Sequence, residues 1–296
     1  MSKSAEVFNL MDNLLPQCTE VEFTAPNELQ RLYAGIGMPS LRAMELSAQA
    51  GVTYYEIKAA NPLLVLIDSV RICYRFGELR EQALLGDADA LNDLGWLLLN
   101  GTRLKPDPLL ARRLFKIAAV MGSSEALFNL AEQAFYGKGV AANPVLAIDY
   151  YEQAFEAGIP CAAQALGSLY ERGDEGVPVD HREAITWYKR GSAELDVMAC
   201  FLLGRLALDE SSIEYDPALG LYWLQWAAMK GQVLATERLA DFYFCIFDSP
   251  PDPDGLLYRF WRDLAVSQGS SWAKELCALD ERSDLALDVR TPYPAS

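Results

Sequence analysis

The chain has 296 residues, of which 51% are hydrophobic, and it carries a formal net charge of −16. No run of residues approaches the roughly 18 to 20 apolar positions that a membrane-spanning helix requires, so we expect no membrane insertion. The negative charge opposes binding to nucleic acid and to anionic membranes; it favours a basic protein partner, or it serves only to keep the chain soluble.

The start of the chain lacks the basic segment and apolar core of a secretory signal peptide, so we expect a cytoplasmic protein. Its six cysteines form no CxxC pair, a pattern typical of free buried thiols in a reducing compartment. A Ser-His-Asp arrangement would have to use the only histidine, His181, which lies at a predicted helix start. We therefore expect no catalytic residues, no metal and no cofactor.

Residues 1–85 have the apolar spacing of several helices, with breaks at Pro16, Gly51 and Gly77. The interval between Gly51 and Gly86 is close to the length of the repeat that follows it in the sequence. Two interpretations remain for this region. It is a helical N-terminal cap or diverged repeat, or it is a separate functional domain.

A small residue recurs at spacings of 36, 36, 37, 36 and 38 residues. Its positions are Ala90, Ala126, Ala162, Ala199, Ala235 and Ala273. A leucine follows four residues after each of the first five. Glycine stands four residues before every member except Ala199, where Leu195 takes its place. A fixed period of this length is typical of stacked helical hairpins.

Each repeat contains two segments with the apolar spacing of an amphipathic helix. The second segment begins with a capping residue and a proline in Asp107-Pro108, Asn143-Pro144 and Asp216-Pro217. Gly137-Lys138-Gly139 comes directly after the first segment of one repeat. A phosphate-binding loop would instead follow a buried strand and open a helix, so we interpret this stretch as a turn that needs positive φ.

Residues 163–192 read AQALGSLYERGDEGVPVDHREAITWYKRGS. Their order of Leu-Gly, Tyr, Gly, Gly-Val, Asp, Ala and Trp-Tyr resembles the Sel-one-like repeat, a relative of the tetratricopeptide repeat. The repeats at 122–157 and 158–194 match well, those at 86–121 and 195–230 less closely, and that at 231–268 is degenerate.

The resemblance implies an all-α fold: a right-handed α-solenoid of about five helix-turn-helix repeats over residues 86–281. Residues 270–281 are then a C-terminal capping helix, and residues 282–296 a loose tail.

In tetratricopeptide-like arrays, the first helix of each repeat lines the concave face. By this analogy, the positions two, six and ten residues after each small residue face a partner. The candidates are Asn92, Trp96, Phe128, Glu132, Tyr136, Gln164, Arg172, Phe201, Arg205 and Asp241, with Ser168 and Glu237 at equivalent positions. Aromatic and arginine side chains on such a face are suitable partner contacts. Alternatively, some of them pack against a neighbouring repeat or the N-terminal region.

We therefore predict a non-catalytic scaffold or adaptor that binds a protein partner on the concave face, and the negative charge of the chain favours a basic partner. One alternative is an immunity or inhibitor protein that neutralises a single toxin, a role that Sel-one-like proteins have in some bacteria. A remote alternative is an enzyme or small-ligand site within residues 1–85. The sequence specifies no oligomeric state.

Overall fold

The computed structural model describes residues 72–100, 106–245 and 255–278. Every regular element in these ranges is a helix, and their β-type pairing is limited to an isolated bridge between Asp174 and Val177. The described ranges therefore confirm the predicted all-α repeat fold. The helical segments predicted within residues 1–71 and the tail predicted at 282–296 lie outside the described residues.

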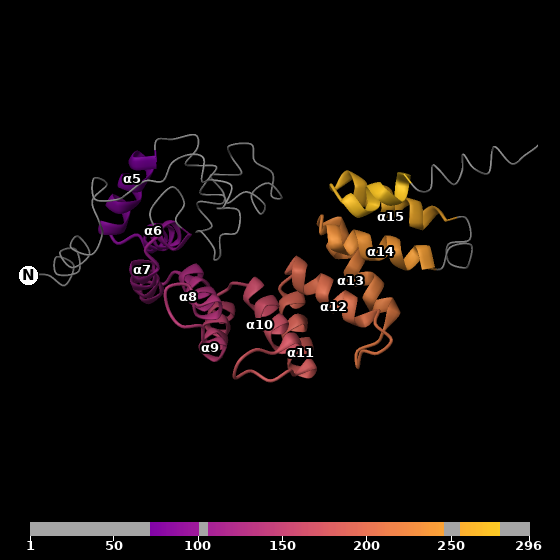
Figure 1. The fold of residues 1–296 in the computed structure, drawn as a ribbon, viewed down its shortest axis with the longest axis horizontal. Coiled ribbons are helices and arrows are strands. Elements are labelled where there is room, and N and C mark those ends of the chain that lie inside the picture. Colours follow the sequence, from indigo (N-terminus) through magenta and orange to yellow (C-terminus); the bar gives the residue numbers. More distant parts are fainter. Residues whose placement is uncertain (1–71, 101–105, 246–254, 279–296) are drawn as a thin grey trace, which may run out of the picture. The chain divides into compact units, whose positions relative to one another are not determined.

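The chain divides into two compact units, Met1–Asp180 and His181–Ser296, here called the first and the second unit. The described helices of the first unit are α5 (Ile72–Leu84), α6 (Ala88–Asn100), α7 (Pro108–Val120), α8 (Ser124–Tyr136), α9 (Pro144–Glu156) and α10 (Cys161–Arg172). Successive helices from α5 to α10 pack against one another (Figure 1). The break predicted at Gly77 is wrong, because α5 continues through this residue. The first helices of successive repeats are α6, α8 and α10.

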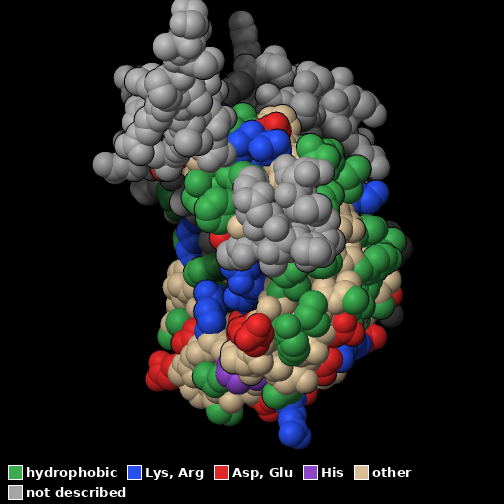
Figure 2. All heavy atoms as spheres, turned by 90° about the vertical axis from the view of Figure 1, so that its right-hand side faces the viewer, with side chains coloured by type: hydrophobic (Ala, Val, Ile, Leu, Met, Phe, Trp, Pro, Cys, Tyr) green, Lys and Arg blue, Asp and Glu red, His purple; other side chains and the backbone are tan. Residues whose placement is uncertain are grey.

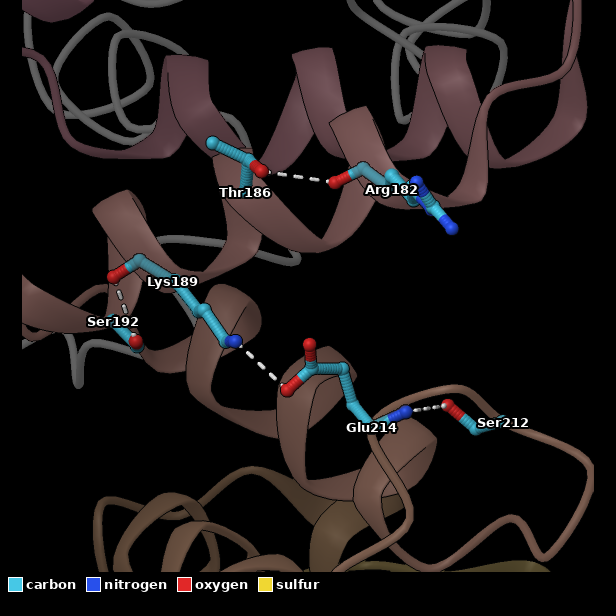
Figure 3. Close-up of polar contacts among 6 residues, drawn as sticks. All are labelled: Arg182, Thr186, Lys189, Ser192, Ser212 and Glu214. Carbon is cyan, nitrogen blue, oxygen red and sulfur yellow. Dashed lines mark hydrogen bonds and ion pairs between the residues drawn. The ribbon is translucent and has the colours of Figure 1, made fainter.

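The helices of the second unit are α11 (His181–Ala193), α12 (Val197–Ala207), α13 (Pro217–Met229), α14 (Val233–Cys245) and α15 (Leu256–Ser267). They too pack in chain order. Residues 271–278 are also helical, within the predicted capping helix. An ion pair of 2.7 Å between Lys189 of α11 and Glu214 links this helix to the loop before α13 (Figure 3).

The three predicted proline-containing caps all begin helices. Asp107, Asn143 and Asp216 accept hydrogen bonds from the backbone N–H of Leu110, Leu146 and Leu219, over 2.9, 2.9 and 3.1 Å. Each cap satisfies one donor that the first helical turn leaves unpaired, which typically contributes about 1 kcal/mol.

The Gly-Lys-Gly stretch forms the predicted turn. Gly137 ends α8 with φ of 67°, and Gly139 has φ of 75°, so both glycines adopt the left-handed region. The half-buried Lys138 donates a hydrogen bond from Nζ to Oδ1 of Asn100 over 3.3 Å. Its ammonium group therefore contacts α6, in the preceding repeat.

The recurring small residues and leucines lie in the helix interfaces. Ala162 and Leu166 of α10 are both 0% exposed, and the other members of the two series are buried as well. The small residue that follows each leucine permits close contact: a Cβ atom at Gly95 would lie 2.7 Å from the Phe115 ring. Within each unit, the period seen in the sequence therefore follows the packing of a first helix on the second helix of its repeat, as in α6 with α7, α8 with α9, α12 with α13 and α14 with α15.

Candidate functional site

A cavity of about 110 Å³ lies between α8, α9 and α10 of the first unit. It has room for several water molecules or for the polar end of a side chain. Its lining residues are Glu132, Phe135 and Tyr136 of α8, Tyr151 of α9, and Gln164, Ala165, Ser168, Leu169 and Arg172 of α10. Most of these side chains carry polar groups, so the cavity is suited to a polar guest.

The buried side of the cavity is organised by Tyr151 and Glu132. Tyr151 is 2% exposed, and its hydroxyl donates a hydrogen bond to Oε1 of Glu132 over 2.5 Å. The Phe128 ring meets the Tyr151 ring edge-on, with centroids 5.5 Å apart. Burial, followed by the neighbouring Glu132 carboxylate, raises the pKa of Tyr151 well above its ordinary value. Tyr151 therefore stays protonated and keeps donating to Glu132.

Tyr136 and Arg172 form the exposed side of the cavity. Tyr136 is 59% exposed, and Nε of Arg172 donates a hydrogen bond to the carbonyl oxygen of Ser168 over 3.3 Å. Within the described ranges, Arg172 makes no ion pair. Burial and the Glu132 carboxylate raise the pKa of Tyr136, whereas the Arg172 guanidinium lowers it. The Tyr136 hydroxyl therefore lies in the field of both charges.

Gln164 and Ser168 complete the polar wall on α10. Nε2 of Gln164 donates a hydrogen bond to Oγ of Ser168 over 3.0 Å, one helical turn further on. An amide and a hydroxyl can each donate and accept hydrogen bonds. Together with Glu132 and Arg172, the cavity therefore offers acceptors and donors, charged as well as neutral, at a site that is already ordered.

Among the residues that the structure describes, no group of three or more His, Cys, Asp and Glu side chains is placed to hold a metal ion. His181 is exposed at the start of α11, in the second unit, where acidic, basic and hydrophobic side chains are interspersed on the face shown (purple in Figure 2).

Four of the ten predicted contact residues line the cavity together: Glu132, Tyr136, Gln164 and Arg172. Phe128 lies beside them through its contact with Tyr151. The two candidates on α6 differ from these cavity residues because they are buried: Asn92 is 0% exposed and Trp96 is 3% exposed. Oδ1 of Asn92 accepts a hydrogen bond from Nδ2 of Asn129 over 2.7 Å. Both side chains of α6 are thus buried and are not open to a partner here.

The three candidates in the second unit have other surroundings. Phe201 is 9% exposed and belongs to the hydrophobic core of this unit. Arg205 is half-buried. Asp241 accepts from Nη1 of Arg238 over 3.2 Å, as an ion pair within α14. None of the three is among the residues that line the cavity of the first unit.

The sequence did not indicate the contribution of Tyr151. It belongs to a second helix, where aromatic residues recur and form core, and Tyr151 is indeed buried. Its hydroxyl could have been used to predict the polar site, because a buried tyrosine hydroxyl requires a hydrogen-bond partner nearby.

None of the helices among the described residues is both long enough and apolar enough to cross a membrane.

Residues 88–123, 124–159, 162–194 and 197–232 match the Sel1 repeat family. Over 157 residues the chain is 31% identical to chitin synthase regulatory factor 4 of Schizosaccharomyces pombe, covering 53% of this chain and 24% of that protein. The chain thus spans about a quarter of the length of this curated relative.

Two crystal structures have a similar fold. One is a Sel1 repeat protein from Oxalobacter formigenes, with a TM-score of 0.59, 24% identity and coverage of 72% of this chain and 87% of that chain. The other is c5321, a protective antigen of uropathogenic Escherichia coli strains that displays an SLR fold. It has a TM-score of 0.59, 24% identity and coverage of 84% and 50%. The chain therefore contains four Sel1 repeats, between residues 88 and 232, and shares the fold of the two repeat proteins.

Proposed function

We propose that the chain is a non-catalytic scaffold that binds a protein partner at the cavity between α8, α9 and α10. Sel1 repeat proteins are typically protein-interaction scaffolds. One observation carries the proposal for this chain. Glu132, Tyr136, Gln164 and Arg172, which the repeat period assigns to one face of two successive first helices, line a single cavity.

The arrangement favours binding because it is formed before a partner arrives. The hydrogen bonds from Tyr151 to Glu132 and from Gln164 to Ser168 hold the side chains in place, so docking costs little conformational entropy. Tyr136 and Arg172 belong to the residue types that most often contribute large shares of binding energy at interfaces. The name of the yeast relative, a regulatory factor, also agrees with an interaction role.

The test is affinity capture from a lysate of the source organism, read by mass spectrometry, with the parent chain and two double variants. Tyr136→Ala with Arg172→Ala removes the exposed side of the cavity. We expect it to weaken capture of the specific partner by roughly tenfold or more, as for interface hot spots. Arg238→Ala with Asp241→Ala removes a similar exposed pair on α14 and should leave capture unchanged.

Thermal unfolding of both double variants has to match the parent for the comparison to count. Equal capture by the parent and the cavity variant would overturn the proposal and transfer the interaction to another surface. Loss of capture in both variants would also contradict it, because the contacts would then not be confined to the cavity.

A dedicated inhibitor is a second candidate, which the net charge of −16 favours because it would steer a basic target towards the chain. The same capture at two salt concentrations separates the two roles. One stoichiometric basic partner that is released as salt rises indicates an inhibitor. Several partners at lower occupancy indicate an adaptor.

A further inference from the structure

The cavity between α8, α9 and α10 contains one charge of each sign. Glu132 contributes a carboxylate and Arg172 a guanidinium, and its other lining side chains are uncharged at neutral pH. Tyr136 lines the cavity together with both charged side chains. An anionic guest would be attracted by Arg172 and repelled by Glu132, and a cationic guest would experience the reverse.

A neutral primary amide avoids both repulsions. Its NH2 group donates hydrogen bonds and its carbonyl oxygen accepts them, at opposite edges of one planar group. The Glu132 carboxylate accepts hydrogen bonds, and one of them comes from the Tyr151 hydroxyl. The guanidinium of Arg172 is a donor, as is the hydroxyl of Tyr136. A planar group of this kind can therefore pair with both the acceptor and the donors of the lining.

We propose that the cavity recognises a carboxamide, the side-chain end of an asparagine or glutamine in the bound segment. The NH2 group donates to Glu132, and the carbonyl oxygen accepts from Arg172 and Tyr136. The inference rests on the proposed function for the source of the amide, a protein partner. The preference of the cavity for an amide does not depend on that partner and can be measured without it.

The experiment uses three fragments of nearly identical size and shape: propionamide, propionate and propionamidine. They present an uncharged, an anionic and a cationic planar group. Each is titrated into the full chain, and binding is followed by the shifts of the backbone amide signals of Tyr136, Gln164 and Arg172 in nitrogen–proton NMR spectra. The signal of Asp241 on α14 is the internal control.

We expect propionamide to bind at the lowest concentration, about tenfold below the two ions, the factor typical of one charge-assisted hydrogen bond. Tighter binding of propionate or propionamidine overturns the amide assignment and leaves the proposed scaffold function standing. Equal shifts at Asp241 and at the cavity signals, or none at all, overturn the cavity as a site.

Two conservative variants test the assigned roles. Glu132→Gln keeps an oxygen for the Tyr151 hydroxyl but removes the negative charge, so it should shift the preference towards propionate. Arg172→Gln removes the positive charge and should shift it towards propionamidine. Glu152→Gln on α9 and Arg113→Gln on α7, exposed residues of the same unit that do not line the cavity, should change nothing. An unchanged preference in both cavity variants would show that these charges do not contact the fragment.

Discussion

The face formed by first helices differs between the two units, although the repeat period predicts equivalent positions in both. In the first unit, Glu132, Gln164 and Arg172 line a cavity with room for a guest. In the second unit, Phe201 is buried in the core and Asp241 is paired with Arg238. The period therefore specifies where the backbone lies, whereas the neighbours of each side chain decide whether it is available to a partner.

The largest loss of stability is expected from a substitution that tests which face of α10 is buried. Leu166 and Gln164 are two residues apart on α10; Leu166 is 0% exposed, and Gln164 lines the cavity. We expect Leu166→Asp to abolish folding of the first unit, because it places an unpaired charge in a packed interface at a cost above about 4 kcal/mol. Gln164→Asp is the matched control and should remain folded.

Far-UV circular dichroism and limited proteolysis measure the outcome for this pair. A Leu166→Asp chain as helical and as protease-resistant as the parent would mean that α10 packs through another face. The assignment of Gln164 and Arg172 to the cavity would then fail with it.

A smaller effect concerns Trp96, which the period assigned to the open face but which is 3% exposed. Its buried Nε1 has no hydrogen-bond partner among the described residues, so the ring contributes mainly by packing. Trp96→Ala should lower the free energy of unfolding by about 3 kcal/mol, whereas Trp96→Phe should cost less than about 1.5 kcal/mol. Urea denaturation of both variants measures the difference. If Trp96→Ala were as stable as the parent, the Trp96 side chain would not be packed in the core, and the original prediction that it lies on the exposed face would hold.

These two cases show what the sequence could and could not predict. The helix pairs, their caps and the buried Leu166 followed from a period and from cap chemistry, both of which act over a few neighbouring residues. Whether Trp96 or Tyr136 is exposed depends on groups from other helices, which a period does not contain. The cavity needed the buried Tyr151 hydroxyl of α9 to hold Glu132, and that contact between two helices is not visible in either segment alone.

The turn after α8 provides a third test, because it separates a structural role from a chemical one. An added Cβ at Gly139, where φ is 75°, would lie 2.3 Å from Cβ of Pro108. We expect Gly139→Ala to cost about 2 to 3 kcal/mol, from backbone strain together with this overlap. Lys138→Ala, which loses only the hydrogen bond to Asn100, should cost less than about 1 kcal/mol. Thermal unfolding compares them, and the reverse order would contradict the interpretation of this stretch as a turn.

The smallest change in stability is expected at the turns that join successive repeats, where one turn has a leucine in place of glycine. The glycines at five of these turns have positive φ, and Leu195 holds the sixth with φ of 57°. The backbone imposes this conformation, because the N–H groups of Leu195 and Asp196 donate to the carbonyl oxygens of Ser192 and Gly191, both over 3.0 Å. The corresponding hydrogen bonds donated by Gly269 and Ser270 are also 3.0 Å long. Leu195 therefore forms the same hydrogen-bonded turn as the glycine at the equivalent position.

We expect Leu195→Gly to stabilise the second unit by about 0.5 to 1 kcal/mol. The substitution removes the backbone strain that a leucine has in the left-handed region, and it removes little packing because Leu195 is 57% exposed. This gain should exceed the loss of stability that glycine causes by making the unfolded chain more flexible. Gly269→Ala is the opposite change at an equivalent turn with no heavy atom within 4 Å of the added Cβ, so it should destabilise through the backbone alone. Urea denaturation measures both. A loss of stability in Leu195→Gly would mean that the leucine side chain contributes packing greater than its backbone strain, and this turn would then differ from the other five in its contacts as well as its sequence.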